Sequence, residues 1–230
     1  MSSSTKHARA RVGRPPGPTP DPEARREEIL DAAERVIAAQ GPDVGMSDIA
    51  AGIGLTKPAV YRSVGDKAEL SAALGRRVAE RLAERLGSAL SAPGEVRDVV
   101  AAAIDVFCTF VDEETNLYRF IVHGSVGTRH TGLQDKPLVT RLGQEISNAL
   151  ALALDRAGAD PSVAGGGVGD SGVGAVDVGL ADTWAYAILG AVFSSTEHWR
   201  RRRHIPRDQF VDQLTRLVTP ALEQLGIAPA

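Results

Sequence analysis

The sequence predicts an all-α protein in which short N-terminal helices are joined by a long helix to a larger helical domain. Apolar residues recur at intervals of three and four along most of the chain, as they do on one face of a helix. Ala and Leu are frequent, whereas runs of β-branched residues are rare. Helix-capping residues and Gly–Pro pairs separate these stretches, so each predicted helix can be justified in turn.

The composition indicates a globular protein inside the cell. The chain has 230 residues, 43% of them hydrophobic, and its single cysteine, Cys108, excludes an intramolecular disulfide. No apolar run approaches the roughly 20 residues that span a bilayer, and no apolar stretch follows the basic residues at the N-terminus. We therefore predict a cytoplasmic protein without a membrane segment, and a buried Cys108 thiol between Phe107 and Phe110.

The charge is distributed unevenly although the net charge is only −3. Residues 1–91 hold 14 Lys and Arg against 12 Asp and Glu, and residues 92–230 hold 12 against 17. The sign of this asymmetry favours contact with an anionic partner at the N-terminal end.

Residues 1–20 are predicted to be a disordered basic arm, because they contain four basic residues, four prolines and no acidic residue. Two interpretations stay open. The arm is either a solvated leader or a segment whose Arg9, Arg11 and Arg14 follow phosphates or enter a narrow minor groove.

The first helix is expected to begin after Asp21, a good N-cap, with Pro22 at its first position. Gly41 and Pro42 are expected to end it. One apolar stripe runs along it, formed by Ile29, Leu30, Ala33, Val36 and Ile37.

The following stretch is predicted to hold two very short helices, a tight turn between them and the start of a long helix. Ser47 is expected to cap the first short helix and Thr56 the second. Gly54 supplies the turn, where a positive φ is easily adopted by glycine. Asp66 and Glu69 have the spacing of a capping box that opens the long helix.

The long helix carries Leu or Val at four-residue steps from Leu70 to Leu90 and is expected to end near Ser91, before Pro93 and Gly94. Further helices are expected over residues 96–111, 116–123, 137–154 and 180–201, and from Pro206 to about residue 225. Residues 158–180, rich in Gly, Ala and Val, are predicted to be a mobile loop or a frayed helix start.

Two short helices around a sharp turn suit a helix-turn-helix, whose second helix presents its N-terminal residues to the major groove of DNA. This segment resembles the DNA-binding domain of TetR-family repressors in Ile49-Ala50, Gly54, Thr56, Val60-Tyr61, Lys67 and Leu70. The resemblance covers residues 22–74 and continues beyond them as a similar pattern of helices. It implies a DNA-binding domain over 21–66 and a ligand-binding and dimerisation domain over 67–230.

The resemblance also implies roles for individual residues. Thr56, Lys57 and Pro58 would lie in the groove, while Tyr61 and Lys67 would contact phosphates of a double-stranded operator. The whole set expected at DNA is Ser47, Thr56, Lys57, Pro58, Tyr61, Arg62 and Lys67, together with Arg9, Arg11 and Arg14 of the arm. The chain departs from the family at Val64, where relatives usually have an aromatic residue.

Large apolar residues beside many Ala and Gly positions in the C-terminal half predict an apolar pocket for a small hydrophobic effector. The alternative is a fully packed core. The residues expected at the ligand are Phe107, Phe110, Tyr118, Ile121, Trp184 and Ile188. Their arrangement is similar to actinobacterial family members that sense fatty acyl-CoA, which implies an acyl-CoA effector.

Small residues on the helix over 180–201 and broad apolar faces on the last two helices predict a homodimer built from a four-helix bundle. The histidines show no metal-site spacing, and the Gly167–Gly172 match to a dinucleotide fingerprint lacks the strand that such a site requires. We therefore expect no metal, no cofactor and no enzymatic activity. The predicted function is a repressor that binds a palindromic operator as a dimer and is released by ligand. The alternative is a small-molecule-binding or enzymatic helical protein with a vestigial helix-turn-helix.

Overall fold

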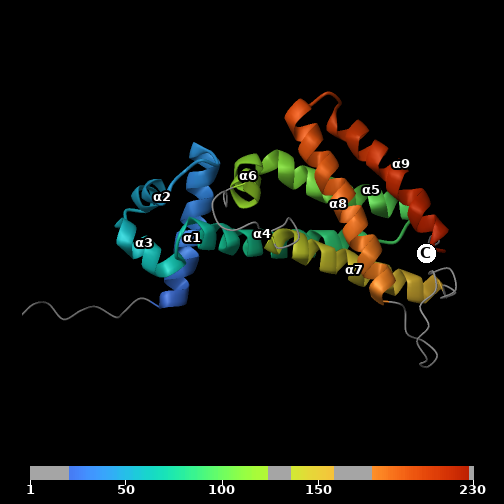
Figure 1. The fold of residues 1–230 in the computed structure, drawn as a ribbon, viewed down its shortest axis with the longest axis horizontal. Helices are drawn as coiled ribbons and strands as arrows, with labels where there is room; N and C mark the ends of the chain where they lie inside the picture. Colours follow the sequence, from blue (N-terminus) through green and yellow to red (C-terminus); the bar gives the residue numbers. More distant parts are fainter. Residues whose placement is uncertain (1–20, 124–135, 158–177, 228–230) are drawn as a thin grey trace, which may run out of the picture.

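A computed structural model describes residues 21–123, 136–157 and 178–227 of the chain (Figure 1). These residues form nine helices and no strand, which confirms the all-α prediction. The helices are α1 (Pro22–Gln40), α2 (Met46–Gly52), α3 (Lys57–Val64), α4 (Lys67–Leu90), α5 (Val96–Glu113), α6 (Thr115–His123), α7 (Pro137–Ala157), α8 (Val178–Arg202) and α9 (Arg207–Gln224). None of them is long and apolar enough to cross a membrane.

Helix α1 begins as its sequence predicts and forms a small core with α2 and α3. The Asp21 carboxylate accepts a hydrogen bond from the Glu23 amide at 3.0 Å, and the amide of Gly41 donates to Ile37 at the other end. The apolar stripe of α1 is buried, and Ile49 of α2 and Val60 of α3 close the core from the other side. Both are completely buried, so these short helices depend on one another for stability.

The predicted cap of α2 is wrong. The helix begins two residues earlier, at Met46, and Gly45 is its N-cap residue, so Ser47 lies exposed in the first turn. The Asp48 carboxylate accepts a hydrogen bond from the Gly45 amide at 2.7 Å, and this bond takes the place of the expected serine cap. Thr56 is the N-cap residue of α3, as predicted, but its side chain makes no capping bond.

Helix α4 runs through both domains, and its 24 residues span about 36 Å. The predicted capping box is present: the Asp66 carboxylate accepts from the amides of Ala68 and Glu69 at 2.8 and 2.9 Å, and Glu69 accepts from the Asp66 amide at 2.9 Å. The helix ends at Leu90, next to the predicted Ser91. It carries α1–α3 at one end and the C-terminal helices along the rest of its length (Figure 1).

The C-terminal helices surround α4 and α5. Helix α7 packs against α4 and α8, and α9 packs against α5. Helices α8 and α9 meet at their connection but make few contacts with each other, so they diverge along their length (Figure 1). Cys108 is fully buried as predicted, and burial raises the pKa of its thiol to about 11. Of the predicted loop at 158–180, the last three residues belong to α8 and the others lie outside the described residues.

Candidate nucleic-acid interface and ligand cavity

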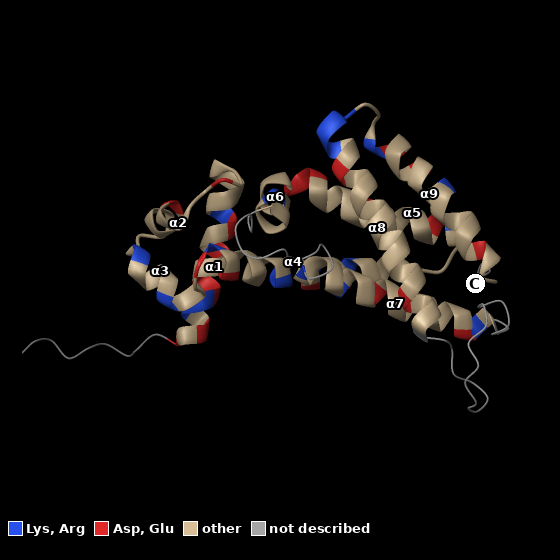
Figure 2. Cartoon of the chain, in the orientation of Figure 1, with Lys and Arg blue, Asp and Glu red and all other residues tan. Residues whose placement is uncertain are grey.

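Helix α3 presents one polar face to solvent. Thr56, Lys57, Pro58, Tyr61 and Arg62 are all exposed, and the Tyr61 side chain is 40% accessible. The Lys57 ammonium lies 5.8 Å from the centre of the Tyr61 ring. The helix contains basic residues and no acidic residue, whereas the neighbouring α1 contains many acidic residues (Figure 2). This face combines hydrogen-bond donors with positive charge, as contact with DNA requires.

Two glycines with positive φ and one hydrogen bond from an arginine set the backbone conformation at the ends of α3. Gly54, in the turn before the helix, has φ +65°, the positive value expected of it. Gly65, directly after the helix, has φ +77°, and a Cβ there would clash with the Glu69 side chain of the capping box. Arg26 of α1 donates a hydrogen bond to the Ser63 carbonyl at 2.9 Å. The orientation of α3 is therefore set by its neighbours on both sides.

Lys67 and the N-terminal arm differ from the α3 residues. Lys67 is half-buried, and its ammonium donates a hydrogen bond to the Val44 carbonyl at 2.9 Å and lies 5.2 Å from the centre of the Phe120 ring. One of its three N–H donors is therefore used within the protein. Arg9, Arg11 and Arg14 lie outside the described residues. Val64, the departure from the family pattern, is fully buried in the small core.

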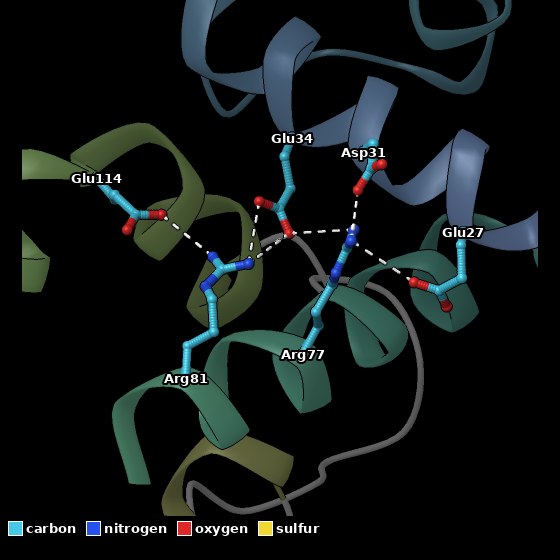
Figure 3. Close-up of polar contacts among 6 residues, drawn as sticks. All are labelled: Glu27, Asp31, Glu34, Arg77, Arg81 and Glu114. Atoms are coloured by element: carbon cyan, nitrogen blue, oxygen red, sulfur yellow. Dashed lines mark hydrogen bonds and ion pairs between the residues drawn. The ribbon is translucent and has the colours of Figure 1, made fainter. Parts of the chain in front are cut away.

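An ion-pair network joins α1 to α4 and to Glu114, which lies between α5 and α6 (Figure 3). Arg77 pairs with Asp31 and lies 3.6 Å from Glu27 and 3.7 Å from Glu34. Arg81 lies 3.1 Å from Glu34 and 3.5 Å from Glu114.

Most of these side chains are partly exposed, so each pair contributes about 1 kcal/mol or less to stability. Their geometric effect is larger, because two arginines on successive turns of α4 hold the same face of α1. The network fixes the orientation of the DNA-binding helices relative to α4.

A cavity of about 580 Å³ lies in the C-terminal domain, between α4, α5, α7, α8 and α9. Its volume is within the range of about 300–1,000 Å³ that is typical of small-molecule sites. Its walls are almost entirely apolar, formed by Leu86, Leu90, Val96, Val99, Val100, Ala103, Ile104, Phe107, Leu142, Ile146, Ala149, Leu150, Ala153, Ala157, Ile188, Leu189, Val192, Val218, Leu222 and Ile227. The remaining lining residues are Ser91, Ala92, Pro93, Gly94 and Arg156.

Two of the six residues expected at the ligand, Phe107 and Ile188, line this cavity. Phe110, Tyr118 and Ile121 are buried elsewhere in the core and are not among its lining residues, and the half-buried Trp184 is not among them either. Tyr118 packs edge-on against Phe110, with ring centres 6.0 Å apart, and likewise against Phe107, at 6.2 Å. The aromatic cluster therefore lies beside the cavity and touches it through Phe107.

Most of the residues that line the cavity were not predicted from the sequence. Residues such as Leu142, Ile146 and Val218 are ordinary apolar positions of amphipathic helices, and their side chains resemble those of any core. Arg156 offered the one distinctive signal, as a basic residue in the last turn of a helix directly before a Gly-rich stretch.

A cluster of charged side chains surrounds the buried Glu197 near the C-terminal end of α8. Its carboxylate accepts from Arg200 at 3.1 Å and from Arg201 at 3.1 Å, and His123 Nε2 lies 3.6 Å away. Burial by itself raises the pKa of this carboxyl, but the two guanidinium groups outweigh it and lower the pKa to about 2. The buried Tyr118 hydroxyl faces the carboxyl without forming a hydrogen bond of good geometry. The cluster links α6 to α8 through a carboxylate that is ionised at neutral pH.

Comparison with known proteins decides the family. A family model described as bacterial regulatory proteins of the tetR family matches residues 29–74, and a model described as tetracyclin repressor-like, C-terminal domain, matches residues 85–227. The chain belongs to the TetR family of transcriptional regulators. It is therefore a DNA-binding regulator with a C-terminal ligand-binding domain, and the helix-turn-helix prediction is confirmed.

Relatives of this TetR-family regulator are also described as HTH-type transcriptional regulators. An uncharacterized HTH-type transcriptional regulator of Mycobacterium tuberculosis is 28% identical over 199 residues, which are 86% of this chain and 77% of the relative. The HTH-type transcriptional activator FasR of Mycolicibacterium smegmatis is 31% identical over 98 residues, 42% of this chain and 45% of FasR.

Solved structures share the fold. A tetR-family regulator from Streptomyces coelicolor has a TM-score of 0.62 at 21% identity, covering 89% of this chain and 82% of the other. The regulator FadR from Bacillus subtilis, solved with stearoyl-CoA, has a TM-score of 0.55 at 16% identity, covering 85% of this chain and 96% of the other. At these identities the likeness concerns the fold alone.

Proposed function

We propose that this regulator is a homodimeric repressor that leaves its operator when a lipophilic effector fills the C-terminal cavity. Residues 21–66 form the DNA-binding domain, residues 67–230 form the ligand-binding and dimerisation domain, and the basic arm at 1–20 adds phosphate or minor-groove contacts through Arg9, Arg11 and Arg14. The supporting observation is that α4 lines the cavity with Leu86 and Leu90 and holds α1 through Arg77 and Arg81. One rigid helix thus connects the ligand site to the DNA-binding helices.

The DNA contacts are assigned to α3 and the helix ends around it. Thr56, Lys57 and Pro58 enter the major groove, because they lie at the exposed N-terminal end of α3. Tyr61 and Arg62 lie one turn further along and contact phosphates beside the groove. Ser47 and Lys67, near the N-termini of α2 and α4, add phosphate contacts at helix ends that favour anions.

The dimer is assigned to the outer faces of α8 and α9, because each carries a stripe of uncharged exposed residues, with Arg216 beside the stripe of α9. Ala187, Gly190 and Ser194 are exposed along α8, and Gln213 and Leu217 are exposed along α9. Leu217 is 63% accessible and adds apolar area to the stripe of α9. The small residues on α8 allow close approach of a partner helix, as in a four-helix bundle from two chains.

The effector acts by changing the relative population of two spacings of the DNA-binding domains. A dimer can hold both half-sites only when they lie about one helical turn of DNA apart, or a multiple of it. A ligand that binds the other spacing more tightly shifts the population toward it by its differential affinity. An acyl-CoA is our specific candidate for the effector, supported by the apolar cavity and by the stearoyl-CoA bound to the structurally similar FadR.

The DNA assignment is tested by selecting an operator from a random DNA pool and then measuring two variants on it. Lys57→Ala should weaken binding and relax base preference at one position of each half-site, because it removes a groove contact. Tyr61→Ala should weaken binding to all sequences about equally, because it removes a phosphate contact. Arg85→Gln, on the exposed face of α4 far from α3, serves as the control. Wild-type affinity and base preference in both variants would refute the assignment.

A further inference from the structure

The cavity has a closed end and an open end. Phe107, Leu142 and Val192 at its inner end are buried. Its exposed lining residues are at the opposite end, in the turn between α4 and α5 (residues 91–94) and in the last turn of α7 (residues 156–157). The mouth therefore faces away from α1–α3, at the far end of the molecule (Figure 1).

The mouth holds the single charge among the described residues that line the cavity. Arg156 is exposed there, and it makes no hydrogen bond or ion pair with any residue that the structure describes. Every other side chain in the lining is apolar except Ser91, which also lies at the mouth. Within the described part of the chain, the site thus has an apolar interior and, at its entrance, a guanidinium that pairs with no described residue.

We infer that the ligand is an anionic amphiphile whose alkyl chain fills the cavity and whose carboxylate or phosphate pairs with Arg156. This inference rests on the proposed lipophilic effector and adds its polarity and its direction in the site. A guanidinium offers a planar fork of N–H donors that matches carboxylate and phosphate oxygens. A neutral or cationic head group of the same chain length gains no such pair.

The length of the walls sets the length of the chain. From Val96 to Phe107, α5 rises about 16 Å, and from Leu142 to Arg156, α7 rises about 21 Å. An extended chain advances about 1.2 Å per bond, since three backbone bonds span at most about 3.6 Å. The cavity accordingly accommodates an alkyl chain of about 13 to 18 bonds.

An anchored head group makes the inner end sensitive to chain length. A chain held at Arg156 touches Phe107 only if it spans the cavity, and Phe107 packs against Tyr118 of α6. Helix α6 contacts α1 through a hydrogen bond from Asn116 to the Ala38 carbonyl at 3.0 Å. A long chain can therefore reach the route to the DNA-binding domain, whereas a short chain ends inside the cavity.

The test measures binding of defined probes to the full-length protein by titration calorimetry at low ionic strength. The probes are tetradecanoate, tetradecanoyl-CoA and the neutral tetradecan-1-ol, with octanoate as the short anion. We expect at least one of the two long anions to bind about 10-fold or more tightly than the alcohol, the advantage of a charge-assisted pair. The long anion whose advantage over the alcohol is lost in Arg156→Gln identifies the carboxylate or the phosphates of CoA as the partner of Arg156.

Two variants separate the anchor from the cavity. Arg156→Gln should still bind the alcohol as the wild type does, but its preference for the long anion should fall to less than about 3-fold. Arg85→Gln removes an exposed arginine that does not line the cavity and should keep the full preference.

The outcomes separate this inference from the proposed function. Equal affinity for alcohol and anions in the wild type, or an unchanged preference in Arg156→Gln, overturns the anchor while leaving a lipophilic effector in place. Tighter binding of octanoate than of the long anions overturns the assigned chain length. If no alkyl probe binds, the lipophilic effector itself is refuted together with the anchor.

Discussion

The DNA-binding domain and the ligand-binding domain of this regulator build their sites in opposite ways. In the first, α1–α3 share a small core, and the side chains proposed to contact DNA are exposed on α3. In the second, the site is a space within the core, and its walls are the same Leu, Val and Ile residues that fill other cores. A surface site depends on what a few side chains can donate, whereas a cavity depends on how five helices are spaced.

The difference predicts how each domain responds to substitution. A variant on the exposed face of α3 changes DNA binding and leaves the fold intact, because Lys57 and Tyr61 support no core. The ligand domain has no such separation, because its walls also hold the helices together. Its function is best tested at positions that serve the assembly or the polar contacts rather than the apolar packing.

The largest effect is expected from Gly190→Arg on the outer face of α8. A Cβ at Gly190 would meet nothing within 4 Å in its own chain, so the single chain can accommodate the arginine. In the proposed dimer the same side chain would separate the two helix pairs that form the four-helix bundle. Operator affinity should fall about 10²- to 10⁴-fold, because two linked DNA-binding domains become independent.

The measurement combines light scattering at micromolar concentration with DNA binding by anisotropy. Ser88→Arg, which places the same charge on an exposed position of α4, is the matched control and should remain dimeric. A dimeric Gly190→Arg with normal operator affinity would show that the uncharged stripes of α8 and α9 are not the interface.

The same contrast explains what could be predicted from the sequence. Helix starts followed local rules, so Asp21 and the Asp66–Glu69 capping box were correct. The cap of α2 was wrong because Asp48, two residues beyond the start of the helix, reaches back to Gly45 and makes Ser47 unnecessary. A local competition of this kind depends on side-chain conformation, which the residue types leave open.

The cavity was predicted as a feature, but most of its wall was not. Aromatic residues were expected to line it, yet Phe110 and Tyr118 pack against each other in the adjacent core. Which apolar residues border an empty space depends on the angles between α4, α5, α7 and α9, and helical periodicity carries no information about those angles. Arg156 was not predicted either, because its place at the cavity mouth becomes evident only when the helices are placed.

The second-largest effect is expected from Glu197→Gln, which should lower the stability of the ligand-binding domain. The pKa of this carboxyl is about 2, below its ordinary value of 4.5, so its ionised form stabilises the fold above pH 4.5. That contribution, on the order of 1–2 kcal/mol at neutral pH once solvent screening is allowed for, is lost as the pH falls from 4.5 through 2. The glutamine variant lacks it at every pH.

Urea unfolding of the two proteins at a series of pH values checks this prediction. The wild type should be the more stable at pH 7, and the two stabilities should converge near pH 2. Glu80→Gln, whose carboxyl pairs with Arg141 at an exposed site, is the control and should change stability by less than about 1 kcal/mol. A constant difference between wild type and Glu197→Gln from pH 7 to pH 2 would show that shape, and not charge, makes Glu197 important.

The smallest effect is expected at Lys67, where the two domains join and a side chain serves both. One N–H of its ammonium is bound to the Val44 carbonyl, which leaves two donors for a phosphate. Lys67→Met keeps the apolar stem beside Phe120 and should lower the free energy of unfolding by about 1 kcal/mol. Because Lys67 is also proposed to contact a phosphate, the slope of log affinity against log salt should decrease in magnitude by about one unit. Arg85→Gln, which also removes one positive charge from α4, should leave that slope unchanged. An unchanged slope in Lys67→Met as well would restrict Lys67 to the contact with Val44 and limit the DNA interface on this side to α2 and α3.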